Sequence, residues 1–139
     1  MSTEENKAVV RRLIEEAYNK GNLAVVDECT AVDFVFHGAA QELKGPEGAK
    51  QLITTLRTAF PDIHMTIDDI VAEGDIVAHR FTYHGTFTGE LSGIAPTGKQ
   101  FKITMAGFTR LAGGKQVEGW AYGDSSALYQ QLGVTPPSQ

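Results

Sequence analysis

The sequence predicts an α+β fold, with helices first and then a mostly antiparallel sheet that carries its helices on one face. Two observations predict it. Apolar residues recur at helical spacing through much of residues 1–60, whereas residues 62–122 alternate in strand fashion between tight turns. Helices followed by consecutive strands are typical of α+β domains. The length of 139 residues fits one domain over residues 1–139, and "VTPPSQ" at 134–139 is expected to be a loose tail.

Three helices are predicted before the first long strands. Ser2 and Glu5 have capping-box spacing, and Gly21 is a natural C-terminal stop for the first helix. A shorter helix is expected over "LAVVDECT". The third begins at Gly45-Pro46, with proline at its first position, and ends at Pro61. The first helix has an apolar stripe of Val9, Val10, Leu13, Ile14, Ala17 and Tyr18.

The strands are predicted by segments rich in β-branched and aromatic residues between Gly-rich turns. A Glu73-Gly74-Asp75 turn, the loop "LSGIAPTGKQ" and the hairpin turn "AGGK" separate them. A last helix is expected over "SSALYQQLG". The predicted extended segments are "DFVFHG", "DIHMTIDDIVAE", "IVAHRFTYHGTFTGE", "FKITMAGFTRL" and "QVEGWAYG".

Composition argues against several classes of partner. The net charge is −5 and no Lys/Arg cluster is present, whereas nucleic acids and anionic membranes need a basic face. No apolar run approaches a membrane span, and the polar start "MSTEENK" is unlike a signal peptide, so a cytoplasmic location is expected. No metal site is predicted: His79 and His84 have opposite parity on one strand, and no His/Cys/carboxylate spacing fits a metal.

Alternation assigns the faces of the two longest strands. Val77, Phe81, Tyr83 and Phe87 share one face, and Phe101, Ile103, Met105, Gly107 and Thr109 form a matching face on the next strand. These faces and the first helix could enclose an apolar cavity or simply fill a core. Alternation alone favours the filled core.

Several segments, in this order and spacing, carry a family resemblance over Glu4 to Gly133. They are "STEENKAVVRRLIEEAYNKGNL", "DFVFHG", "GPEGAKQLITTLRTAFPD", "GTFTGELSGIAPTGK" and "GGKQVEGWAYGDSSALYQQLG". The chain resembles the SnoaL-like polyketide cyclases (ester cyclase type) of the nuclear-transport-factor-two-like superfamily. The resemblance implies a cone-shaped, strongly curved sheet wrapped around helices, with a deep internal pocket.

The resemblance also implies a chemistry. Cyclases of this family close a polyketide ring by intramolecular aldol condensation with neither metal nor organic cofactor, and an aspartate at the end of the last strand acts as general acid/base. In this chain Asp124 occupies that position, in "GWAYGD". Many relatives have polar residues where this chain has Phe87, Gly107 and Gly119, so the resemblance implies a more apolar and roomier pocket here.

Asp124 and His37 are the expected catalytic residues, each with a structural alternative. In an apolar pocket the pKa of Asp124 would rise, and it could donate a proton. Asp124 also directly precedes "SSAL", where aspartate is a preferred N-cap, and a cap would lower that pKa. The resemblance favours the pocket. His37 could hydrogen-bond a substrate carbonyl, or it could be a strand-end histidine bonded to a neighbouring backbone carbonyl.

Aromatic and apolar residues are the expected substrate contacts. Trp120 and Tyr122 could stack on a flat ligand, although such residues are more often core or dimer contacts. Tyr18 could point its hydroxyl into the cavity or be a core tyrosine. The expected substrate-binding residues are Tyr18, Tyr83, Phe87, Met105, Trp120 and Tyr122.

Three functions fit these residues. The first is a cofactor-free cyclase or isomerase acting on a small, largely apolar or aromatic, polyketide-like molecule. The second is an epoxide hydrolase on the same scaffold, which would need carboxylates with an arginine between them; the third is a non-catalytic binding protein. A homodimer is expected through the outer sheet face, at Arg80, Thr82, His84, Thr104 and Phe108.

Overall fold

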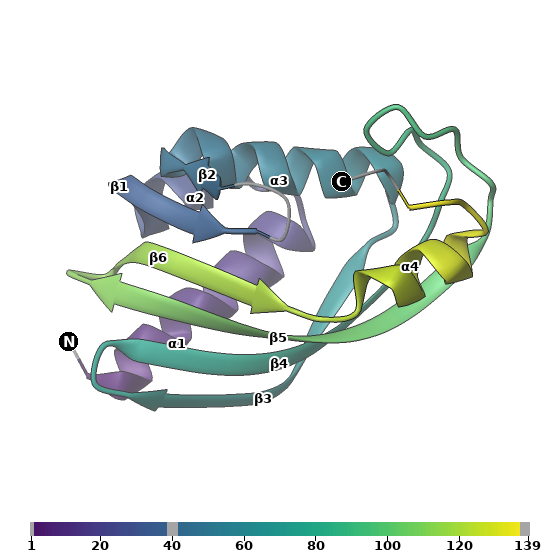
Figure 1. The fold of residues 1–139 in the computed structure, drawn as a ribbon. Helices are drawn as coiled ribbons and strands as arrows, with labels where there is room; N and C mark the ends of the chain where they lie inside the picture. Colours follow the sequence, from purple (N-terminus) through teal and green to yellow (C-terminus); the bar gives the residue numbers. More distant parts are fainter. Residues whose placement is uncertain (1, 39–41, 137–139) are drawn as a thin grey trace.

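The computed structural model describes residues 2–38 and 42–136. Helices and strands occur in the predicted order, and the α+β class is confirmed (Figure 1). The elements are α1 (Thr3–Arg12), the π-helix η1 (Leu13–Tyr18), α2 (Ala24–Cys29), β1 (Thr30–His37), β2 (Glu42–Lys44), α3 (Gly45–Ala59), β3 (His64–Glu73), β4 (Ile76–Thr86), β5 (Gln100–Ala112), β6 (Lys115–Tyr122) and α4 (Ser125–Leu132).

The six strands form one sheet in the order β2-β1-β6-β5-β4-β3. Neighbouring strands are antiparallel except β1 and β6, which are parallel. Register shifts interrupt the β1–β6, β3–β4 and β5–β6 ladders, and such irregularities increase the local bend and twist of a sheet. Figure 1 shows the curved sheet with α1 and α3 on the same side. The predicted mostly antiparallel sheet is confirmed.

The first helix changes its hydrogen-bonding pattern part-way along. The predicted capping box is present, with Glu5 N–H donating to the Ser2 hydroxyl and Ser2 N–H donating to the Glu5 carboxylate. After Arg12 the helix widens into η1, where Asn19 N–H donates to the Ile14 carbonyl five residues earlier at 3.0 Å. A π-turn adds a residue to the helical turn and is frequent at functional sites. It sets the direction of Tyr18, the last residue of η1.

The long strand predicted over 76–90 ends earlier, at Thr86. The chain then leaves the sheet because Thr88 and Gly89 donate their N–H groups to the carbonyl of Ala59, at the end of α3. A Cβ on Gly89 would collide with the Thr58 carbonyl oxygen, so this close approach requires glycine. The loop over 87–99 is thereby fixed to α3.

An aromatic core fills the end of the molecule next to α4. Phe60 contacts Phe101 and Phe87 with ring centroids 4.6 and 5.8 Å apart, and Leu132 of α4 is fully buried.

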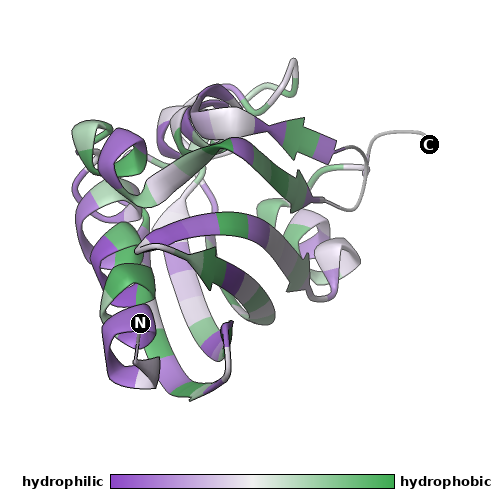
Figure 2. Ribbon diagram, turned by 90° about the vertical axis from the view of Figure 1, so that its left-hand side faces the viewer, coloured by the Kyte–Doolittle hydropathy of each residue, from purple (hydrophilic) through white to green (hydrophobic). Residues whose placement is uncertain are grey.

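Figure 2 shows polar and apolar residues alternating along the strands. The sheet face opposite the helices is therefore mixed and more exposed. The predicted tail begins with Val134, whose N–H donates to the Tyr129 carbonyl; its residues 137–139 lie outside the described part of the chain.

Candidate functional site

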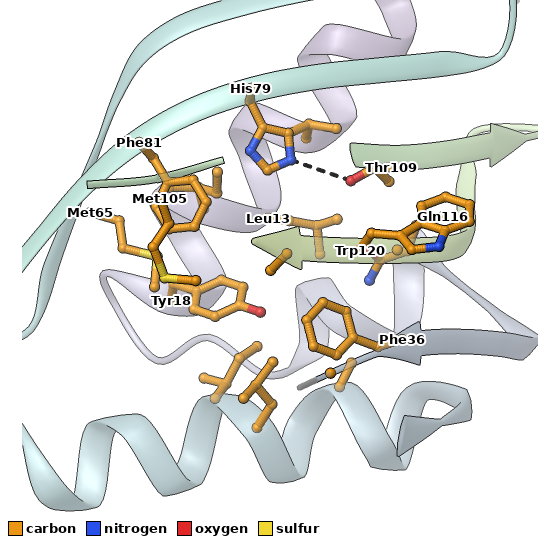
Figure 3. A pocket seen from close by; sticks show the side chains of 18 of the residues that line it. Leu13, Tyr18, Phe36, Met65, His79, Phe81, Met105, Thr109, Gln116 and Trp120 are labelled. Atoms are coloured by element: carbon orange, nitrogen blue, oxygen red, sulfur yellow. Dashed lines mark hydrogen bonds between the residues drawn. The ribbon is translucent and has the colours of Figure 1, made fainter. Parts of the chain in front are cut away.

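A cavity of about 420 Å³ lies between the helices and the sheet (Figure 3). Residues from the helices and from all six strands line it, and most of them are apolar, for example Leu13, Phe36, Ile53 and Met65. The exposed lining residues Gly123 and Ser125 lie at the junction of β6 and α4, which places an opening there. The core that alternation alone predicts to be filled is therefore interrupted by this cavity.

Few polar side chains reach this cavity. None of its described lining residues is Asp, Glu, Lys or Arg. Such a site suits an uncharged, largely apolar molecule that is oriented by a small number of hydrogen bonds. The polar lining residues, beside the indole of Trp120, are Tyr18, His79, Tyr83, Thr109, Gln116 and Ser125.

His79 of β4 is a cavity residue that sequence reasoning did not select. Its Nε2 lies 3.4 Å from Thr109 Oγ1 on β5, and its Nδ1 is buried with no hydrogen-bond partner in the described part of the chain. Burial lowers the pKa of His79 to about 4, so the imidazole is neutral at neutral pH. Strand alternation puts His79 on the face of Val77 and Phe81, and this signal could have found it.

Tyr18 and Tyr83 line the cavity. Burial raises the pKa of each phenol to about 12, and at Tyr83 the neighbouring Tyr129 adds to the effect. Both hydroxyls therefore keep their protons at neutral pH and can donate hydrogen bonds. Figure 3 shows the Tyr18 hydroxyl pointing into the cavity, with the predicted contact Met105 close by.

Asp124 is the N-cap of α4. Its Oδ1 accepts from the N–H groups of Ser126 and Ala127 at 3.0 and 3.3 Å, and from the Ser126 hydroxyl. These hydrogen bonds, led by the one from the Ser126 side chain, lower the pKa of the carboxyl group. Asp124 is exposed and does not line the cavity, whereas Gly123 and Ser125 do. The expected inward carboxyl group is corrected to an ionised helix cap.

His37 lies on the side of β1 away from the cavity. Its Nε2 is 2.7 Å from Glu118 and its Nδ1 is 2.8 Å from Glu42. Hydrogen bonding to Glu118, followed by that to Glu42, raises the pKa of His37. Its ring stacks on Trp120, which borders the cavity, at a centroid distance of 5.3 Å. The expectation that His37 faces the pocket is corrected because its neighbour Phe36 takes the inward position.

Two other expected pocket contacts lie elsewhere. Phe87 is fully buried in the aromatic core against Phe60 and does not line the cavity. Tyr122 is 59% exposed and makes an edge contact with Phe108 at 6.3 Å. Phe108 and Tyr122 directly follow Gly107 and Ala121, which pair with each other on the cavity face beside His79, so their contact lies on the outer face.

Comparison with known proteins gives the family. The profile of the SnoaL-like polyketide cyclases matches residues 8–132. The chain belongs to this family. This SnoaL-like chain is 30% identical over 134 residues to the aklanonic acid methyl ester cyclase DnrD of Streptomyces peucetius, a match covering 94% of the chain and 92% of DnrD.

Solved structures similar to the SnoaL-like chain share its whole fold. TsrD from Streptomyces laurentii superposes with a TM-score of 0.87 at 26% identity, covering 97% of this chain and 99% of TsrD. A protein from Catenulispora acidiphila DSM 44928 with a ketosteroid isomerase-like fold, solved with trimethylamine, gives a TM-score of 0.76 at 22% identity, covering 91% and 93%. The second likeness supports the fold alone.

Gly107 and Gly119, which were expected to make the pocket roomier, do not enlarge the cavity. A Cβ on Gly107 would lie 2.7 Å from Cε1 of His79, and one on Gly119 would lie 3.2 Å from Phe36. Neighbouring rings already occupy both spaces. The expectation of a roomier pocket is therefore wrong at these positions. The space beside Gly107 is occupied by the imidazole of His79.

Within residues 2–38 and 42–136, no helix is long and apolar enough to cross a membrane. The same residues contain no group of three or more His, Cys, Asp or Glu side chains that could hold a metal ion.

Proposed function

We propose that this chain is a cyclase that closes a carbon ring in a small, largely apolar polyketide by intramolecular aldol condensation, without a cofactor. The largely apolar cavity of about 420 Å³, with its few neutral polar groups, carries this proposal. The name of the relative DnrD points to the methyl ester of a polyketide acid as the substrate class. A flat, uncharged polycyclic ester would meet apolar walls on both faces.

The cavity can assist such a reaction in two ways. Its apolar walls exclude water and hold the nucleophilic carbon near the ketone, which favours ring closure through proximity. Negative charge develops on the ketone oxygen as the carbon–carbon bond forms, and a protonated phenol can stabilise it. Tyr18 and Tyr83 are such donors, since the pKa of each is about 12.

The direct test is turnover of aklanonic acid methyl ester, the compound in the name of the relative. We expect a product of unchanged mass and different chromatographic retention, because an aldol ring closure that proceeds without loss of water is an isomerisation. Met105→Trp, which fills the cavity, should abolish the conversion. Val71→Trp, at a position 63% exposed, is the matched control and should keep it. Unchanged ester after prolonged incubation with folded protein would reject the cyclase assignment.

The second candidate is a non-catalytic binding protein for the same class of ligand. The absence of charged side chains among the described lining residues favours it. Native mass spectrometry would then detect an unaltered ligand on the protein, with no product released.

The epoxide-hydrolase alternative has less support, because Arg80 pairs with Asp69 at 2.6 Å on the outer sheet face rather than in the cavity.

The protein is further proposed to be a homodimer formed through the outer face of the sheet. Phe108 and Tyr122 expose aromatic surface there, 41% and 59% respectively, beside paired charges such as Arg80 and Asp69. A self-complementary mixed face suits a two-fold interface. Light scattering should give twice the chain mass of 15.0 kDa, and Phe108→Asp should halve it. A wild-type monomer at micromolar concentration would end this proposal. The cytoplasmic location stays a prediction.

A further inference from the structure

The cavity contains one described lining residue whose side chain has a basic nitrogen that can accept a proton at neutral pH. The titratable groups among those residues are Tyr18, His79 and Tyr83. Both phenols hold their protons up to about pH 12, so they serve as donors only. The imidazole of His79 is neutral and has a basic nitrogen, which a proton transfer needs.

The imidazole of His79 has neighbours on several sides, but one of its two ring nitrogens has no hydrogen-bond partner in the described residues. Thr109 Oγ1 lies 3.4 Å from Nε2, and the ring of Phe81 lies 5.6 Å away between centroids. Gly107, its partner across the ladder, leaves the space in which the ring sits. Nδ1 has no partner in the described residues. A buried polar atom without a partner is costly and uncommon, and a catalytic role is one recognised reason for it.

We propose that His79 is the catalytic residue that takes and returns the proton in the ring closure, a role that rests on the proposed cyclase function. Its neutral imidazole removes a proton from the carbon between two carbonyl groups of the substrate and leaves an enolate. That carbon forms the new carbon–carbon bond to the ketone carbon. The carbonyl π electrons move to the ketone oxygen, which takes the proton back from the imidazolium. No atom is gained or lost.

This assignment gives Asp124 a structural role. Its Oδ1 is already bonded to two backbone N–H groups and one hydroxyl at the start of α4, and the side chain is exposed. Asparagine caps a helix about as well as aspartate. Asp124→Asn therefore keeps the cap and removes the titrating group, which makes it the control for His79.

The test compares kcat and KM for aklanonic acid methyl ester in the wild type, His79→Gln and Asp124→Asn. Glutamine can still hydrogen-bond Thr109 but cannot exchange a proton. We expect His79→Gln to lower kcat by about 100-fold or more, with KM changed only a few-fold. Asp124→Asn should stay within about threefold of the wild type. A kcat for His79→Gln close to that of the wild type would overturn the assignment and leave the cyclase function standing. An inactive wild type would instead reject both.

A pH profile and a second variant separate catalysis from folding. Wild-type kcat/KM should fall as the pH drops through about 4, where His79 becomes protonated, and His79→Gln should lack that fall. On the neighbouring strands His79 faces Ile70, Gly107 and Thr109, and the charged Arg80 points to the other sheet face. Gly107→Ala keeps the imidazole but displaces it. It should lower kcat with folding intact; an unchanged kcat in this variant also counts against the proposal.

Discussion

Replacing Phe87 by alanine is expected to lower the free energy of unfolding by about 3–5 kcal/mol. The ring is fully buried and packs against Phe60, whose own ring contacts Phe101. Removing it leaves a void that these neighbours can only partly fill, so both burial and packing are lost.

Urea denaturation followed by circular dichroism measures this loss. Val32→Ala, at a position 89% exposed, is the control and should change stability by less than about 0.5 kcal/mol. If Phe87→Ala costs less than about 1 kcal/mol, the ring borders open space and the pocket-wall position predicted from the sequence is restored.

The second large effect is a pH-dependent stability that comes from His79. Its pKa in the folded chain is about 4, below the ordinary value of about 6.5. As the pH falls from about 6.5 to about 4, the imidazole binds a proton in the unfolded chain but not in the folded chain. The stabilisation is therefore complete above about pH 6.5 and is lost progressively down to about pH 4, by about 2–3 kcal/mol in all.

Urea denaturation at pH 4 to 7.5 tests this dependence. The wild type should lose more stability on acidification than His79→Gln, which has no imidazole to protonate there. His64→Gln reports the effect of removing an exposed imidazole from the same sheet. Parallel curves for the wild type and His79→Gln would show that the imidazole is solvated rather than buried.

Much of the fold follows from local sequence. The Ser2–Glu5 capping box, the proline at the start of α3 and the alternation along β4 depend on neighbouring residues, and each is found as predicted. The strand β2 (Glu42–Lys44) is too short to show a period. The parallel pairing of β1 with β6 and the π-turn of η1 depend on distant packing, which local periodicity does not encode.

The candidate site was harder to predict, for specific reasons. Asp124 is equally suited to a cap and to a pocket, and only the direction in which α4 leaves β6 decides between them. The partners of His37 are set by the register of β1 on β6, which brings in Glu118 from 81 residues away. His79 could have been found, since strand alternation alone puts it with Phe81 on the inner face.

The parallel pairing of β1 with β6 has a consequence for biosynthesis. β6, which pairs with β1 and supplies Gln116, Gly119 and Trp120 to the cavity wall, is synthesised only after β2, α3, β3, β4 and β5 have followed β1. Contacts between such distant segments form late, because a long loop must close first. A nascent chain therefore exposes the apolar inner side of β1 until β6 has been made, and in that interval it is most prone to aggregate.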